Sequence, residues 1–160
     1  MPQQDKDRAA LAGEYFRQGY NCCQSVALAF SDIALEKGVG EEQLKALSSG
    51  FGGGFGRLRE VCGCVSGMTL IAGFLSPSDP SDQASRKNCY ALVQQLAAEF
   101  RGRNGSIVCR ELLGLRSGQV DPPNPSERTP GFYHARPCEA LVRCAASILQ
   151  EKLQATTDPV

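Results

Sequence analysis

The side chains of this chain that could carry redox or metal chemistry are its eight cysteines. A cysteine thiolate is a nucleophile and a ligand for soft metals, and a helix start stabilises it through free backbone N–H groups and the positive end of the helix dipole. Cys22 directly follows Asn21, which is a good helix cap. Cys138 directly follows Pro137, a residue favoured at the first helical position. Cys109 lies three residues after another cap residue, so we expect a lowered pKa for these three thiols.

Cys62 is a further candidate. It lies less than two helical turns after a glycine-rich segment, and Gly63 and Gly67 follow it. Glycine has no side chain, so another backbone or a cofactor can approach these positions closely. Several arginines lie near the candidate cysteines in the sequence and would favour their thiolates: Arg57, Arg59, Arg110 and Arg136.

The other four cysteines carry weaker signals for chemistry. Cys89 and Cys144 fall on apolar helix faces, where cysteine commonly acts as a small buried hydrophobe, so we interpret both as packing residues. Cys23 and Cys64 each lie beside a stronger candidate and have no distinguishing position of their own. Their roles stay open at this point.

The spacing of the cysteines disfavours two common thiol sites. Cys62 and Cys64 are separated by one residue, and the chain has no paired Cys-x-x-Cys motifs. A structural zinc ribbon and a thioredoxin-type active site are therefore both disfavoured. The single histidine, His134, lies four residues before Cys138 and is a candidate base or metal ligand.

The segment from residue 50 to residue 56 is too rich in glycine for a helix interior, where each glycine costs about 1 kcal/mol relative to alanine. We expect a loop here. It could present backbone N–H groups to an anion, or it could let two helices cross closely. We favour close packing beside the cysteines. The candidate cofactor contacts are Gly52, Gly53, Gly54 and Gly63.

Apolar residues recur at helical spacing along most of the chain, without an alternating strand pattern. This predicts a single-domain, all-α bundle of about six to seven helices over residues 1–160, with frayed ends at 1–4 and 156–160. The expected helices cover residues 5–17, 21–38, 41–49, 58–74, 81–101, 106–114 and 137–154. Gly102 would end the fifth helix, and Ser106 would cap the sixth.

Residues 115–137 contain five of the nine prolines and are predicted to form one long loop. Loops of this length in compact domains commonly cover or build a site. The loop delivers His134 and Arg136 immediately before Cys138. We therefore expect it to close over the cysteines and to limit the access of solvent and oxidants.

Charge and hydropathy disfavour several classes of protein. Lys plus Arg number 17 and Asp plus Glu number 17, so no net charge attracts a polyanion, and we expect no nucleic-acid partner. No stretch of about 18 apolar residues is present, so we expect no membrane span. The polar first residues do not resemble a secretion signal. We expect a cytoplasmic protein, whose cysteines are metal ligands, redox-active thiols or buried residues rather than structural disulfides.

These residues resemble the family of redox-active proteins named for its C-GCAxxG-C-C cysteine pattern. The resemblance runs from about Phe16 to Leu149. Its elements are Gly19-Tyr20-Asn21-Cys22, Phe51-Gly52-Gly53-Gly54 with Gly56-Arg57, Cys62-Gly63 with Gly67, Asn104-Gly105-Ser106 with Cys109, Leu112-Leu113-Gly114, and Cys138. The resemblance implies a redox role without a defined substrate and four recurrent cysteines: Cys22, Cys62, Cys109 and Cys138. At Cys23 and Cys64 the chain departs from the family, in which we expect alanine.

Three hypotheses for function follow. The leading one is thiol–disulfide or electron-transfer chemistry on four converging cysteines, in which Cys62 or Cys109 attacks a small oxidised substrate or a redox partner protein. In the alternative, the four thiolates hold an iron–sulfur cluster or another soft metal, with His134 as an additional candidate ligand. A second alternative is a structural helical protein with inert, buried thiols.

Overall fold

The computed structural model describes residues 6–76 and 79–157, and within these ranges the chain is all-α, as predicted. The described residues contain no strand, and one isolated antiparallel bridge joins Val61 to Val108. The last helix continues to Thr157, so residues 156 and 157 are not part of a frayed end. The other expected frayed residues, 1–4 and 158–160, lie outside the described part of the chain.

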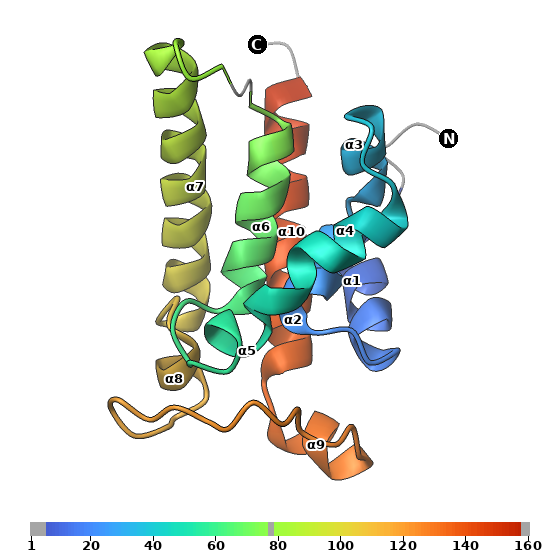
Figure 1. The fold of residues 1–160 in the computed structure, drawn as a ribbon, viewed down its shortest axis with the longest axis vertical. Coiled ribbons are helices and arrows are strands. Elements are labelled where there is room, and N and C mark those ends of the chain that lie inside the picture. The colour runs from blue at the N-terminus through green and yellow to red at the C-terminus, as the bar shows by residue number, and fades with distance from the viewer. Residues whose placement is uncertain (1–5, 77–78, 158–160) are drawn as a thin grey trace.

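Five helices build the main core, with α6 and α10 side by side at its centre (Figure 1). They are α1 (Arg8–Arg17), α2 (Cys22–Leu28), α6 (Gly63–Phe74), α7 (Gln83–Asn104) and α10 (Cys138–Thr157). Helix α10 contacts α1, α2, α6 and α7. Met68, Phe100 and Leu149 are fully buried between these helices. The apolar faces that the sequence spacing indicated therefore meet in one core.

The helix expected over residues 21–38 is broken into α2 and α3 (Ser31–Glu36), so that prediction is wrong. The break falls at Ala29 and Phe30, which are both fully buried. Nη1 of the buried Arg8 donates a hydrogen bond to the Ala29 carbonyl (2.7 Å) and pairs with Asp32 at the start of α3. Arg8 thus satisfies a backbone group that the break leaves without a helical partner. Helix α4 (Glu41–Ser48) packs across α2 and α3 through a second, smaller core around Leu44.

The glycine-rich segment is more ordered than the expected loop. A 3₁₀ turn, η2 (Ser49–Phe51), leads into the one-turn element α5 (Gly52–Phe55). Gly53 and Gly54 both have φ of 69°, in the left-handed region that glycine enters without steric cost. The left-handed conformation then continues through non-glycine residues, including Arg57 (φ 68°) and Arg59 (φ 62°). We call residues 53–59 the left-handed turn.

Helix α6 begins at Gly63 and not near residue 58, so the predicted start of that helix is wrong. The chain before it pairs with the segment before α8 (Cys109–Leu112). The amide of Cys62 donates to the Ile107 carbonyl (2.8 Å), and the amide of Cys109 donates to the Glu60 carbonyl (2.6 Å). These long-range hydrogen bonds replace helical ones, and a local sequence pattern cannot reveal them.

Two predicted helix boundaries around residue 104 are also wrong. Helix α7 continues past Gly102 and ends at Gly105, whose φ of 91° supplies the left-handed cap. The residue before α8 is Val108 rather than Ser106. The Ser106 hydroxyl accepts a hydrogen bond from the Val108 amide (2.9 Å), so it stabilises the turn that precedes the helix.

The segment 115–137 contains a short helix, α9 (Pro130–Ala135), which the prediction of one uninterrupted loop missed. Thr129 caps α9 by accepting a hydrogen bond from the Phe132 amide, and Pro130 occupies its first position. We call residues 115–137 the long loop. In Figure 1 it runs in orange beneath α8 and α5 to the start of α10.

Candidate functional site

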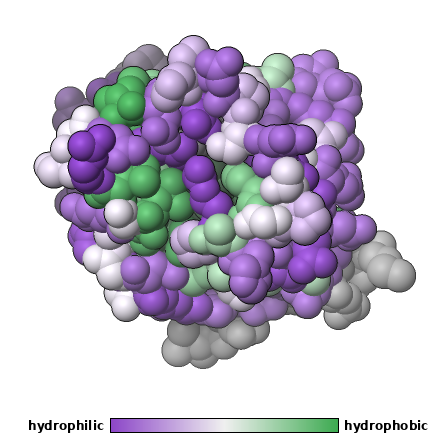
Figure 2. All heavy atoms as spheres, turned by 90° about the horizontal axis from the view of Figure 1, so that it is seen from below, coloured by the Kyte–Doolittle hydropathy of each residue, from purple (hydrophilic) through white to green (hydrophobic). Residues whose placement is uncertain are grey.

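A cavity of about 420 Å³ lies where the long loop passes the starts of α2, α6, α8 and α10. Seen from this end, the molecule has hydrophobic side chains gathered in a hollow that hydrophilic ones surround (Figure 2). Five of the eight cysteines line the cavity: Cys22, Cys62, Cys64, Cys109 and Cys138. The four expected site cysteines are therefore brought together, and Cys64 joins them.

Each of the four expected cysteines lies at a helix start. Cys22, Cys109 and Cys138 are the first residues of α2, α8 and α10. Cys62 directly precedes α6, a position hidden from the sequence because that helix was expected to begin earlier. At α2 the Asn21 side chain and Gln24 form a reciprocal capping box, which fixes Cys22 at the helix start.

Cys22 is the thiol that this arrangement favours as a thiolate. The Cys64 thiol has the largest influence on its pKa, and the backbone N–H groups of Gly53 and Cys23 act in the same direction. These donors outweigh burial and lower the pKa of Cys22 to about 6. The same interaction, with a second one to Cys62 and burial, raises the pKa of Cys64 far above its ordinary value. Cys64 is therefore a neutral hydrogen-bond donor, a role that the sequence analysis left open.

The expectation of a lowered pKa is wrong for the other two first-turn thiols. Burial raises the pKa of Cys138 to about 12, and the nearby Cys22 and Cys62 add to this. Burial also raises the pKa of Cys109, although Nη1 of Arg59 lies 3.6 Å from its sulfur and opposes the shift. A position at a helix start does not by itself produce a thiolate, because desolvation of the sulfur can outweigh the helix dipole.

The remaining three cysteines do not line the cavity. Cys23 is fully buried in the core, and burial raises its pKa. Cys144 packs against the main core and accepts a hydrogen bond from the Asn104 side chain (3.4 Å). Cys89 is half-buried on α7 and is not part of the main core.

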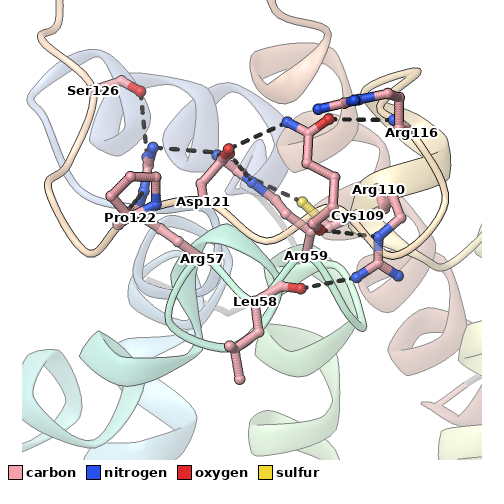
Figure 3. A network of polar contacts seen from close by, with 10 residues as sticks. Arg57, Leu58, Arg59, Cys109, Arg110, Arg116, Asp121, Pro122 and Ser126 are labelled. Atoms are coloured by element: carbon pink, nitrogen blue, oxygen red, sulfur yellow. Dashed lines mark hydrogen bonds and ion pairs between the residues drawn. The ribbon is translucent and has the colours of Figure 1, made fainter.

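A polar network ties the left-handed turn to the long loop and to Cys109 (Figure 3). The Arg59 side chain is almost completely buried, and its Nε donates to a carboxylate oxygen of Asp121 (2.7 Å) while Nη1 reaches the Cys109 sulfur. The hydrogen bond from Arg59 holds the pKa of Asp121 below its usual value. Arg57 donates to the Pro122 carbonyl (2.7 Å) and to the Ser126 hydroxyl (3.3 Å). The sequence analysis did not single out Asp121. Its only distinguishing feature in the sequence is that it directly precedes two prolines.

The matched family model has the description "Putative redox-active protein (C_GCAxxG_C_C)" and covers residues 20–152. The chain belongs to this family. No curated protein and no solved structure matches the chain. The matched range contains all five cysteines of the cavity and the whole long loop.

The long loop of this C_GCAxxG_C_C protein forms one side of the cavity and is docked on the end of α1. Arg128 donates to the carbonyls of Phe16 and Tyr20 (3.1 Å each), and its guanidinium lies 4.4 Å from the centre of the Phe16 ring. The Tyr133 hydroxyl also contacts carbonyls at the end of α1. Loop residues that line the cavity are Pro123, Pro125, Ser126, Arg128, Phe132 and Arg136. That the loop restricts access of oxidants stays a prediction.

Three of the other expected site residues, His134, Gly54 and Gly63, do not line the cavity. His134 is exposed on α9 and does not line the cavity. Gly54 also lies outside the lining, because it packs against the Cys109 side chain, where an added Cβ would come within 2.6 Å. Gly63 packs against the Cys22 sulfur, with which an added Cβ would collide. Close packing beside the cysteines, the favoured interpretation of the sequence, describes both positions.

Gly52 and Gly53 do line the cavity, and Gly53 has a chemical contact there through its N–H group to Cys22. Among the described residues, no group of three or more His, Cys, Asp or Glu side chains is arranged to hold a metal ion. Within the same part of the chain, no helix is long and apolar enough to cross a membrane.

Proposed function

We propose that this protein is a thiol–disulfide oxidoreductase in which the Cys22 thiolate attacks a disulfide in the cavity. The observation that carries the proposal is the position of Cys22 at the start of α2, where it lines a cavity large enough for a substrate together with Cys64. Cys64, with the backbone N–H groups of Gly53 and Cys23, also lowers the pKa of Cys22 to about 6. A thiol with a pKa near the ambient pH is the most effective attacking group in thiol–disulfide exchange. Cys22 therefore replaces Cys62 and Cys109 as the nucleophile that we favour.

The reaction has two steps. The Cys22 thiolate attacks one sulfur of the substrate disulfide, forms a mixed disulfide and releases the other half of the substrate as a thiolate. Cys64, whose thiol hydrogen-bonds Cys22, then gives its proton to that thiolate and attacks the Cys22 sulfur. A Cys22–Cys64 disulfide forms, and the second half leaves as a thiolate that takes a proton from water. Two electrons pass from the cysteines to the substrate, which becomes two thiols.

Cys62, directly before α6, interacts with the Cys64 thiol and helps to raise its pKa. In the proposal it thereby keeps Cys64 protonated until the second step. Cys109 and Cys138 have raised pKa values, and both are neutral thiols at pH 7. In the proposal they line the cavity without attacking the substrate. Cys109 is held by Arg59 at the side of the cavity that the long loop approaches.

The test uses the reduced protein and bis(hydroxyethyl) disulfide at pH 7. We expect release of two thiols per chain and a Cys22–Cys64 disulfide in the peptide map. Cys64→Ser should stop after one thiol, with the mixed disulfide on Cys22. Cys144→Ser, which removes a thiol outside the cavity, should behave like the unchanged protein. A first mixed disulfide on Cys109 or Cys138, or no reaction at any cysteine, would overturn the proposal.

Iron–sulfur or soft-metal binding by Cys22, Cys62, Cys109 and Cys138 is the second candidate. The observation in its favour is that these four thiols line one cavity, and four cysteines are the usual ligand set of an iron–sulfur cluster. Anaerobic purification with analysis of iron, labile sulfide and the absorption spectrum separates the two candidates. Bound iron with sulfide, lost on replacement of any of the four cysteines, would favour the cluster. A colourless protein with titratable thiols is the result expected from thiol–disulfide exchange.

A further inference from the structure

The lining of the cysteine cavity carries positive charges without acidic ones. Among the described residues that line it, four are arginines and none is an aspartate or glutamate. The four are Arg57, Arg59, Arg128 and Arg136. The whole chain has no net charge, so this cavity is a local concentration of positive charge in a neutral protein.

One carboxylate behind the lining compensates part of this charge. Asp121 lies 2.6 Å from Nη2 of Arg59 and 3.9 Å from Nη2 of Arg57, so its single negative charge is shared between two guanidinium groups. Arg59 is the arginine closer to Asp121, and its Nη1 also donates to the Cys109 sulfur. Burial, followed by repulsion from Arg59, lowers the pKa of Arg57. Its Nε and Nη1 already donate to the Pro122 carbonyl and the Ser126 hydroxyl, so Arg57 offers a ligand mainly its charge, which the more distant Asp121 balances only in part.

The other two arginines have no carboxylate partner among the described residues. Arg128 is satisfied by neutral groups, namely the Phe16 carbonyl in α1, the Tyr20 carbonyl after it and the face of the Phe16 ring. Arg136 lies 5.3 Å from the centre of the Phe132 ring, and its guanidinium makes no hydrogen bond or ion pair within the part of the chain that the structure describes. Its five N–H donors are available to a ligand.

We propose that the cavity binds a small organic disulfide that carries carboxylate groups, with Arg136 as the residue that holds a carboxylate and Arg57 as a second positive charge that attracts it. A guanidinium group is the side chain best suited to a carboxylate, because its paired N–H groups match the two oxygens. The cavity volume of about 420 Å³ is in the range for small-molecule ligands. Phe16, Phe132 and Leu141 supply apolar wall for the hydrocarbon part of such a substrate. This inference names the substrate class of the proposed exchange reaction and rests on that function.

The first experiment compares three small disulfides that differ mainly in end-group charge: dithiodipropionate (negative), bis(hydroxyethyl) disulfide (neutral) and cystamine (positive). The rate of Cys22 mixed-disulfide formation with each is divided by the rate of free mercaptoethanol under the same conditions, which removes intrinsic differences in reactivity. We expect the normalised rate to fall in that order, by about tenfold or more from the first to the last at low salt, and the spread to narrow as salt is added.

Three variants in the cavity and one control variant outside it locate the charges responsible for the preference. Arg136→Gln and Arg57→Gln should each reduce the preference for dithiodipropionate over cystamine, whereas Arg136→Lys should retain much of it because the positive charge remains. Arg101→Gln removes an exposed positive charge on α7, outside the cavity, and should leave the preference unchanged. Equal normalised rates for the three probes in the unchanged protein would overturn the inference.

A second experiment measures binding without chemistry. Suberate has the shape of dithiodipropionate with two methylene groups in place of the sulfur atoms, so it can bind but cannot react. We expect suberate to raise the melting temperature of the reduced protein and to slow alkylation of Cys22, whereas hexanediamine should do neither. Both effects of suberate should be lost in Arg136→Gln. If suberate binds but none of the three disulfides reacts with Cys22, the anion site is supported and the proposed function is rejected. Reaction with all three disulfides without suberate binding would retain the function and reject the anion site.

Discussion

Helices α2 and α10 each begin with a cysteine, but the pKa values of the two thiols are shifted in opposite directions. Cys22 and Cys138 are each the first residue of a helix, and both line the cavity. The pKa of Cys22 is lowered to about 6 by hydrogen bonds from Cys64, Gly53 and Cys23. Burial, with the nearby Cys22 and Cys62, raises the pKa of Cys138 to about 12. The comparison teaches that hydrogen-bond donors brought in from other elements decide which helix-start thiol becomes a thiolate.

The largest expected effect is the difference in alkylation rate between these two thiols at pH 7. The lowered pKa of Cys22 favours its thiolate at this pH, whereas Cys138, with its raised pKa, is almost entirely protonated. The lower intrinsic nucleophilicity of the Cys22 thiolate offsets part of this advantage. We expect iodoacetamide to modify Cys22 about a hundredfold faster, as mass spectrometry of the native protein can measure. Faster labelling of Cys138 would reverse the comparison.

The pH dependence of folding stability is the next largest effect. Because the folded pKa of Cys22 lies below its ordinary value of about 9, its contribution is present above pH 9 and is lost as the pH falls towards 6. The raised pKa of Cys138 acts in the opposite direction, so its contribution is present below pH 9 and is lost above it.

Denaturant unfolding from pH 6 to pH 10 tests both signs. Cys22→Ala should remove a rise of about 2 kcal/mol in the free energy of unfolding between pH 6 and pH 9, the full linkage being reduced by solvent screening. Cys138→Ala should leave that rise in place and make the fall above pH 9 shallower, while the raised pKa values of Cys23, Cys64 and Cys109 maintain the rest of the fall. Parallel pH profiles for both variants and the unchanged protein would refute the assignment of the two thiols.

The approach of α6 to Cys22 gives a smaller effect. A Cβ at Gly63 would collide with the Cys22 sulfur and come within 3.1 Å of the Phe51 carbonyl. Gly63→Ala should therefore destabilise the protein by about 1–3 kcal/mol and raise the pKa of Cys22 by disturbing its hydrogen bonds. Gly73→Ala lies in the same helix with nothing within 4 Å of the new Cβ, and should be neutral or slightly stabilising. Equal melting temperatures of the two variants would show that the contact with Cys22 has no energetic weight.

The smallest expected effect concerns the long loop. Arg128→Gln removes two hydrogen bonds to the end of α1 and the contact with the Phe16 ring, together worth about 1 kcal/mol of loop docking. We expect oxidation of Cys22 by hydrogen peroxide to become about fivefold faster, with the helical circular-dichroism signal unchanged. Arg128→Lys keeps the positive charge but lacks the paired N–H donors of the guanidinium group. Its Cys22 oxidation rate should therefore lie between those of the unchanged protein and Arg128→Gln. An unchanged oxidation rate would make the loop a passive connector.

The boundaries of the core helices followed from the sequence where the signals are local. Asn21 and Thr129 each cap a helix through their own side chain. The sequence pattern predicted the cap at Asn21 but not the one at Thr129, which lies in a segment expected to be a loop. Helix α10 was expected from Pro137 because proline is favoured at a helix start, and the structure begins it one residue later. The break at Ala29 was not predictable, because the group that stabilises it comes from Arg8 in another helix.

The candidate site divides in the same way between sequence and tertiary structure. Local signals in the sequence placed three of the site cysteines, Cys22, Cys109 and Cys138, near helix starts, because cap residues and a proline mark those positions within a few residues, but they missed Cys62 at the start of α6. The sequence by itself did not determine that Cys64 lies against Cys22, that Gly53 directs its N–H group at the same sulfur, or that Asp121 is the partner of Arg59. Those contacts join segments that are far apart along the chain, and the pKa of a buried thiol depends on them more than on its own helix. These long-range contacts, and not the local helix start, therefore select Cys22 as the thiol with the lowered pKa.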